Sequence, residues 1–259
     1  TCLEKQTGKT VEAYVDDVVI KTRHVDSFID DLRLTFTNLR TYDIKLNPEK
    51  CVFGVPAGKL LGFIVSSRGI EANPAKIRAL SQLAIPTDLK QIQKLTGCVA
   101  ALSRFISRLG EKALPLYRLL RRTEHFEWTD TATAGLEEIK AILATNPILV
   151  VPTVGEPMLL YIAATHQVVS AVLVIEREMD RHKFPLQKPV YYVSTVLTPC
   201  KSWNPHYQKI AYAVFMASRK LRHYFQECSI MVASEVPLND IINNRDATSR
   251  IAKWAIELL

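Results

Sequence analysis

A run of strand-forming residues interrupted by two neighbouring aspartates constrains this chain more than any other feature of its sequence. Residues 11–22 are rich in Val and Ile, and Asp16 and Asp17 stand together in the middle of them. The pattern predicts two short strands joined by a turn that carries both carboxylates. Like charges at this spacing repel, and a divalent metal ion would relieve the repulsion. Asp side chains also satisfy the backbone of ordinary turns, so the residues alone leave both interpretations open.

The rest of the chain predicts an α/β (α+β) protein with two different halves. Apolar residues recur at helical spacing over residues 25–39, and again in one buried stripe from Pro86 to about Leu109. Residues 60–66 predict a strand between these helices. From Pro157 the pattern changes to strands over 158–163, 168–176 and 189–194, a long helix over 205–225, a strand over 229–233 and a last helix over 248–259. This order predicts a mixed sheet, with a domain boundary around residues 124–156.

Positive charge is concentrated in the middle of the chain. Residues 45–123 contain 14 Lys and Arg against 4 Asp and Glu, whereas residues 124–259 contain 13 against 14. Neutralising nucleic-acid phosphates is the usual role of such a segment. A solvated basic face that binds nothing specific would have the same composition, and charge alone does not separate the two.

Composition excludes several classes of protein. The chain has 48% hydrophobic and 23% charged residues, which is typical of a globular protein. It contains no uncharged apolar stretch long enough for a transmembrane helix and no apolar leader, so we expect neither a membrane partner nor secretion. Its five cysteines are scattered, which argues against a disulfide framework and favours an intracellular location. The missing initiator Met suggests a fragment.

Several blocks of the sequence resemble the Pol polyprotein of gypsy-type plant retrotransposons. The blocks are the segment 11–21 around Tyr14-Val15-Asp16-Asp17, then 46–54, 60–66, 69–76, 89–97, 103–106, 113–120 and 126–129. They occur in the family's order and at spacing like the family's. The resemblance implies the end of a reverse-transcriptase palm over residues 1–72, thumb and connection helices over 73–125, and an RNase H-like domain over 126–259. The implied activity class is RNA-directed DNA polymerase, a nucleotidyltransferase, joined to RNase H.

The same resemblance assigns roles to individual residues. Asp16 and Asp17 match the catalytic pair that binds Mg²⁺ or Mn²⁺, and Tyr14 lies beside the primer end. Leu61 and Gly62 match the primer grip. The implied partners are an RNA/DNA template–primer duplex and the rest of the Pol polyprotein. Basic residues expected to follow the duplex phosphates are Lys90, Lys94, Arg104 and Arg108.

Two departures from the family predict that this chain is inactive by itself. A further catalytic Asp comes from a strand well upstream of the hairpin, and nothing before residue 11 supplies it, so we expect no tight metal binding here. In the RNase H-like half, Ala163 and Gln208 replace two catalytic carboxylates, and Glu235 replaces an Asp. Alanine and neutral glutamine cannot hold a pair of divalent cations.

Two explanations stay open for an RNase H-like fold that lacks its catalytic carboxylates. One is decay of a transposon copy, and the other is a structural connection that supports the polymerase half and the hybrid. A second hypothesis comes from another class of protein, a non-catalytic RNase H-like binding or scaffold module with a basic helical arm.

Overall fold

The computed structural model describes residues 2–22, 24–120, 126–178, 184–243 and 249–258. The chain forms two compact units, Thr1–Ser67 and Arg68–Leu259, which are described separately. Both combine helices and strands, so the predicted α/β class is confirmed. The predicted division at residues 72 and 125 remains a prediction, and residues 121–125 lie outside the described part. None of the described helices is both long and apolar enough to cross a membrane.

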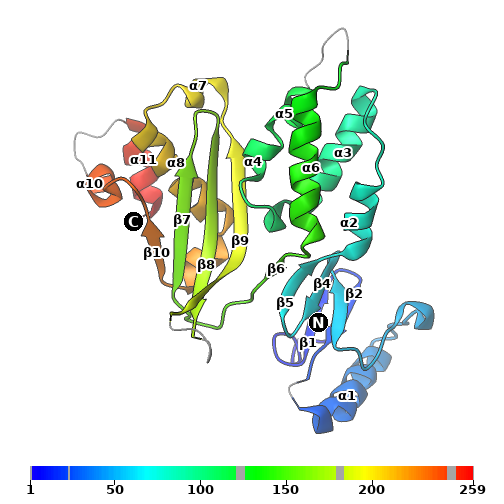
Figure 1. The fold of residues 1–259 in the computed structure, drawn as a ribbon. Coiled ribbons are helices and arrows are strands. Elements are labelled where there is room, and N and C mark those ends of the chain that lie inside the picture. The colour runs from blue at the N-terminus through cyan, green and yellow to red at the C-terminus, as the bar shows by residue number, and fades with distance from the viewer. Residues whose placement is uncertain (1, 23, 121–125, 179–183, 244–248, 259) are drawn as a thin grey trace. The chain divides into compact units, whose positions relative to one another are not determined.

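The first unit contains two hairpins and one long helix (Figure 1). β1 (Val11–Tyr14) pairs antiparallel with β2 (Asp17–Ile20), as the alternation around the aspartates predicts. Helix α1 (Phe28–Thr41) follows the 3-10 turn η1 (Val25–Ser27), and a second 3-10 turn, η2 (Pro48–Lys50), comes later. The core of this unit is small, because among the described residues its cluster of buried apolar side chains contains Leu3, Val11 and Leu39 alone.

The expected strand over residues 60–66 is a hairpin instead. β3 (Ala57–Leu60) pairs antiparallel with β4 (Phe63–Ser66), and Leu61 and Gly62 form the turn between them. Both turn residues have positive φ, 50° and 79°, which suits the tight turns that match the twist of paired strands. The prediction was wrong because Leu61 has strand propensity, and only Gly62 in the sequence marks the turn.

The second unit is centred on a four-stranded mixed sheet in the order β10-β7-β8-β9. β7 (Met158–Ala164), β8 (Val168–Arg177) and β9 (Leu186–Val196) form an antiparallel meander, and β10 (Ile230–Ala233) lies parallel to β7. Helix α8 (His206–Lys220) packs on one face, where its residues Ala213, Met216 and Ala217 join the buried core. Helix α11 (Ser249–Leu258) packs on α8, with the Trp254 ring stacked 5.9 Å from Phe215. The remaining elements of this half are α7 (Pro199–Ser202), α9 (Arg222–Glu227) and α10 (Leu238–Asn243).

The predicted helix over 205–225 is interrupted. Leu221 leaves helical geometry at φ −113° and ψ 29°, and its side chain is buried. The chain therefore turns between α8 and α9, which the helical spacing of the sequence did not indicate.

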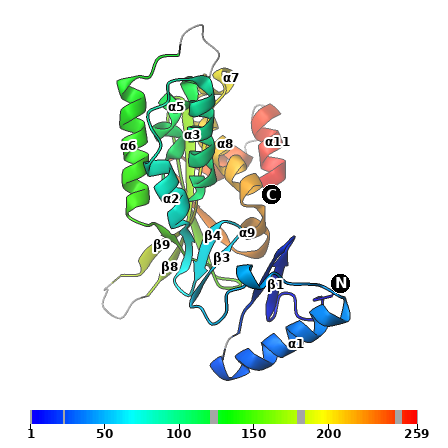
Figure 2. The same cartoon turned by 90° about the vertical axis from the view of Figure 1, so that its right-hand side faces the viewer.

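A group of helices precedes the sheet in sequence. These are α2 (Pro74–Ser81), α3 (Leu89–Ala101), α4 (Leu109–Lys112), α5 (Leu114–Arg118) and α6 (Asp130–Ala144). Asn73, Asp88 and Thr129 cap α2, α3 and α6 with their side-chain oxygens. In Figure 2, α6 and α11 lie at opposite sides of this unit. β5 (Gly69–Ala72) pairs with β6 (Ile148–Leu149), and Gly69 is needed there, because a Cβ would lie 2.2 Å from the Leu149 carbonyl oxygen.

The single helix expected from Pro86 to about Leu109 is broken after Ala101. A 3-10 turn, η3 (Ser103–Phe105), and the short helix α4 follow, and both pack against β9. The break buries the side chains of Leu102, Phe105, Ile106 and Leu109. Each such burial stabilises the fold by roughly 1.5–3 kcal/mol, more than the roughly 0.5–1.5 kcal/mol of each helical hydrogen bond lost.

Candidate nucleic-acid interface and degenerate catalytic positions

The aspartate pair lies at the tip of the first hairpin. Tyr14 is opposite Asp17 in the register, so Val15 and Asp16 form a two-residue turn. Val15 has φ 52°, a left-handed conformation that is costly for a β-branched residue. Its side chain is 86% exposed, so no burial compensates for that cost within this unit. Asp16, Asp17 and Tyr14 are all exposed.

The pair offers part of a metal site. Two neighbouring exposed carboxylates suit Mg²⁺, which binds proteins through one or two carboxylates and completes its shell with water and phosphate oxygens. Across the described residues, no group of three His, Cys, Asp or Glu side chains is arranged to hold a metal ion. The donor set therefore fits a metal only when other ligands complete it.

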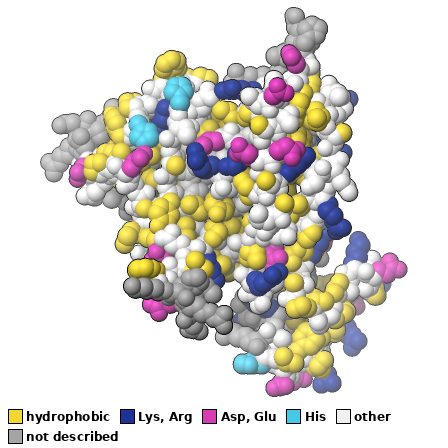
Figure 3. All heavy atoms as spheres, in the orientation of Figure 1, with side chains coloured by type: hydrophobic (Ala, Val, Ile, Leu, Met, Phe, Trp, Pro, Cys, Tyr) yellow, Lys and Arg dark blue, Asp and Glu magenta, His cyan; other side chains and the backbone are white. Residues whose placement is uncertain are grey.

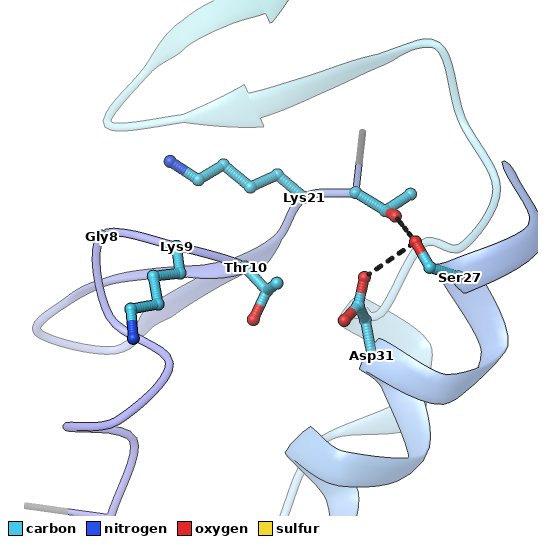
Figure 4. Close-up of a pocket in the computed structure, with 7 residues that line it drawn as sticks. Gly8, Lys9, Thr10, Lys21, Ser27 and Asp31 are labelled. Atoms are coloured by element: carbon cyan, nitrogen blue, oxygen red, sulfur yellow. Dashed lines mark hydrogen bonds between the residues drawn. The ribbon is translucent and has the colours of Figure 1, made fainter. Parts of the chain in front are cut away.

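A cavity of the first unit lies at the other end of this hairpin. It encloses about 560 Å³ and is lined by Gly8, Lys9, Thr10, Lys21, Thr22, Ser27 and Asp31 (Figure 4). Lys21 donates a hydrogen bond of 2.6 Å to Glu12, and Ser27 lies between Thr22 and Asp31. Four-residue strands span roughly 13 Å, so this cavity is separate from the aspartate tip.

The predicted primer-grip residues form a hairpin turn. Leu61 is 46% exposed, and Gly62 follows it at the tip between β3 and β4.

The four predicted basic contacts fall into two different environments. Lys90 and Lys94 are exposed one turn apart on α3. Arg104 and Arg108, by contrast, are not on that helix. The Arg104 guanidinium lies 4.5 Å from the centre of the Tyr191 ring on β9, which ties η3 to the sheet. Arg108 bonds to Glu111, and this hydrogen bond raises the pKa of Arg108.

The three positions predicted to be degenerate RNase H sites lie on three different elements. Ala163 is near the end of β7, Gln208 is in the first turn of α8, and Glu235 follows β10. Ala233, the last residue of β10, pairs with Tyr161, so β10 ends two residues before Glu235 and its pairing on β7 ends two residues before Ala163. Ala163 is exposed, whereas its neighbours Ile162 and Ala164 pack against the core that α8 covers. Strand alternation therefore puts Ala163 on the opposite face from α8.

Polar contacts that the sequence did not indicate hold this end of the sheet. His206 Nε2 lies 2.6 Å from Glu235 Oε1, so the first residue of α8 bonds to the segment after β10. The buried Lys209 donates a hydrogen bond of 3.1 Å to the carbonyl of His166, in the turn between β7 and β8. No motif spacing marks these contacts, because they join residues 29 and 43 positions apart.

The Gly110 amide donates a hydrogen bond of 2.9 Å to the Ser194 hydroxyl, and so joins α4 to β9. Ser194 also bonds to Ser170 of β8. A Cβ at Gly110 would lie 2.7 Å from both Ser194 Oγ and Val168 Cγ1, so only glycine permits this close approach. Gly110 itself lies inside α4.

Comparison with known proteins finds sequences and structures similar to this chain. Residues 128–232 match the family model of the RNase H-like domain found in reverse transcriptase. The retrovirus-related Pol polyprotein from transposon opus of Drosophila melanogaster is 26% identical over 97% of this chain. The transposon Tf2-3 polyprotein of Schizosaccharomyces pombe is 24% identical over 100% of it. The chain spans only 26% and 19% of the length of these two relatives.

A solved structure shows the same fold. The foamy viral protease-reverse transcriptase in complex with RNA/DNA hybrid superposes with a TM-score of 0.82 over 99% of this chain and 35% of that one, at 20% identity. The chain is therefore similar, over nearly its whole length, to the reverse transcriptase and RNase H-like region of retrotransposon Pol polyproteins, and the match to the RNase H-like domain lies in its second half.

Proposed function

We propose that this chain is a non-catalytic part of a reverse transcriptase that helps hold an RNA/DNA template–primer duplex. The observation that carries the proposal is an RNase H-like sheet with Ala163 and Gln208 at positions that the resemblance to the family matches with catalytic carboxylates. The same compact unit includes the α3 helix with exposed Lys90 and Lys94. A fold without its carboxylates but with a basic helix suits binding better than hydrolysis.

The aspartate hairpin has a separate role in this proposal. Within an intact Pol polyprotein, Asp16 and Asp17 would hold Mg²⁺ or Mn²⁺ together with a carboxylate from upstream sequence. The metal would supply electrostatic stabilisation of phosphoryl transfer. Tyr14 and the Leu61–Gly62 turn would contact the primer. The assignment to the gypsy-type lineage is also part of the proposal, supported by the motif order and by relatives in fly and fission yeast transposons.

A salt series tests the binding function. The full chain is titrated with a fluorescent RNA/DNA duplex at several salt concentrations. We expect the logarithm of the affinity to fall linearly with the logarithm of salt concentration, with a slope near −0.9 for each phosphate contacted. Lys90→Gln with Lys94→Gln should reduce the slope by about 2. Lys140→Gln is the control, because Lys140 already bonds to Glu137. An affinity that does not change with salt would contradict phosphate contact.

Two activity assays test the absence of catalysis. We expect no primer extension on an RNA template and no hydrolysis of the RNA strand in a hybrid, each with Mg²⁺ or Mn²⁺. Robust nucleotide incorporation would show that the aspartate pair suffices, and RNA cleavage would show that the RNase H-like half keeps a working site.

The alternative is a scaffold module that binds no nucleic acid. The contact of the Gly110 amide with Ser194 favours a structural role for the second unit, because it fixes α4 to the sheet. A duplex affinity that is negligible at low salt would select this alternative.

A further inference from the structure

A second cavity opens beside β9, the strand at one edge of the sheet in Figure 1. It encloses about 260 Å³, and a water molecule occupies roughly 30 Å³, so a phosphate group and several waters would fit. None of its residues belongs to the catalytic or basic positions assigned above. The lining residues are Ser103, Leu109, Tyr191, Tyr192, Val193, Ser194 and Lys220.

Among the described residues that line this cavity, the one charged side chain is an exposed lysine, Lys220. Lys220 Nζ donates a hydrogen bond of 3.2 Å to the neutral hydroxyl of Thr195. Throughout the described residues, no carboxylate pairs with it, and no acidic residue lines the cavity. Burial lowers the pKa of Lys220, since desolvation disfavours the charged ammonium. A nearby anion would offset that cost.

The other polar groups of the cavity can donate hydrogen bonds. The hydroxyls of Ser103 and Tyr192 have no hydrogen-bond partner among the residues that the structure describes. Burial raises the pKa of Tyr192, so its phenol keeps its proton and can donate at neutral pH. Arg104, whose guanidinium lies over the neighbouring Tyr191 ring, adds positive charge beside the cavity.

The cavity of the first unit lacks this combination. Its Lys21 already bonds to Glu12, and the carboxylate of Asp31 lies in its lining (Figure 4). Asp31 therefore places a carboxylate in that lining, whereas no acidic residue lines the cavity beside β9.

We propose that the cavity at the edge of β9 binds one phosphate group, with Lys220 supplying the charge and Ser103 and Tyr192 the hydrogen bonds. Resting on the proposed function, we assign that group to the backbone of the bound nucleic acid. The site would then fix one phosphate against the RNase H-like sheet, at a position separate from the exposed lysines of α3.

Inorganic phosphate tests the cavity without any nucleic acid. Nuclear magnetic resonance of the full chain would follow the side-chain signals of Lys220 and Tyr192 as phosphate is added. We expect both signals to shift, and Lys220→Gln to weaken phosphate binding at least tenfold. Tyr192→Phe should weaken it less while keeping the charge. Phosphate binding that persists unchanged in both variants would mean an adventitious ion only. That result would overturn the proposed phosphate site in this cavity.

The duplex salt series separates failure of the cavity from failure of the proposed function. Lys220→Gln should reduce the slope by about 0.9, the value for one phosphate, whereas Lys140→Gln should leave it unchanged. An unchanged slope in a folded Lys220→Gln variant overturns the backbone assignment, even where the wild-type chain binds duplex. If the wild-type chain binds no duplex, the proposed function fails. The phosphate titration alone then shows whether the cavity binds phosphate.

Discussion

The pKa of a single residue in this chain can depend on hydrogen-bond partners that the sequence does not reveal. Glu156 accepts hydrogen bonds from the Arg177 guanidinium and from the Thr153 backbone amide. Arg177 also donates to the Val151 carbonyl, so this cluster fastens the segment before β7 to the end of β8. The hydrogen bond from Arg177 is the main cause that lowers the pKa of Glu156, to about 2.

Removing the Glu156 charge should cost stability in a way that depends on pH. The folded-state pKa of about 2 lies below the ordinary value of 4.5, so the stabilisation is fully present above pH 4.5 and is lost as pH falls through 2. We expect Glu156→Gln to lower the free energy of unfolding by roughly 1–3 kcal/mol at pH 7, the range for charged hydrogen bonds. Urea unfolding at pH 7 and at pH 3 measures the effect, which should shrink at the lower pH.

Glu137→Gln provides the control for this substitution. Glu137 pairs with Lys140 on the exposed surface of α6, where ion pairs contribute about 1 kcal/mol or less. Equal losses in the two variants, or a loss in Glu156→Gln that does not depend on pH, would contradict the role given to the Arg177 contact.

At the scale of elements, close approach of α4 to the sheet is the feature most open to test. Gly110→Val should destabilise the second unit by roughly 1–3 kcal/mol, because its side chain would overlap Ser194 and Val168. Gly97→Ala on α3 is the matched control, since a Cβ there meets nothing within 4 Å. That change should stabilise α3 by roughly 0.5–1 kcal/mol. Thermal unfolding of both variants decides the matter, and a Gly110→Val protein as stable as wild type would show that α4 can move away from the sheet.

The sequence predicted elements well where local pattern determines them. The Asp hairpin, α1, the capped helices and the meander of β7 to β9 follow from alternation, helical spacing and cap residues. The break after Ala101 could not be predicted, because Leu102 to Leu109 continue the apolar stripe and only packing against β9 interrupts the helix. The turn at Leu61 was missed for a related reason, since one Gly stands among strand formers.

For the candidate site, the sequence identified the residues themselves better than the contacts that surround them in the fold. Asp16 and Asp17 lie at the hairpin tip where alternation predicts them. Arg104 and Arg108 were expected to follow the duplex phosphates, but their contacts with Tyr191 and Glu111 depend on the fold. Lys220 and Tyr192 were not singled out at all, because their shared cavity brings together strands and helices distant in sequence.

At the scale of the whole molecule, the two units differ greatly in how much apolar surface they bury. Among the described residues, the core of Thr1–Ser67 has three buried apolar residues, and apolar side chains such as Val25, Val52 and Phe53 are exposed. The core cluster around the mixed sheet of Arg68–Leu259 contains fourteen buried residues, and Figure 3 shows further hydrophobic side chains over β7 and β8. Because stability follows apolar burial, the first unit should be much the less stable.

This difference predicts that the chain unfolds in two steps. All three tryptophans, Trp128, Trp203 and Trp254, lie in the second unit, so their fluorescence reports on that unit alone. Far-ultraviolet circular dichroism reports on both units, and we expect it to show an earlier transition at low urea that fluorescence does not follow. Labelling of Cys2, which packs against the first core and bonds to the Asn38 carbonyl, should become fast in the same urea range. Coincident transitions by all three probes would mean that the units fold as one cooperative body, and the small core would then have to be stabilised by the larger one.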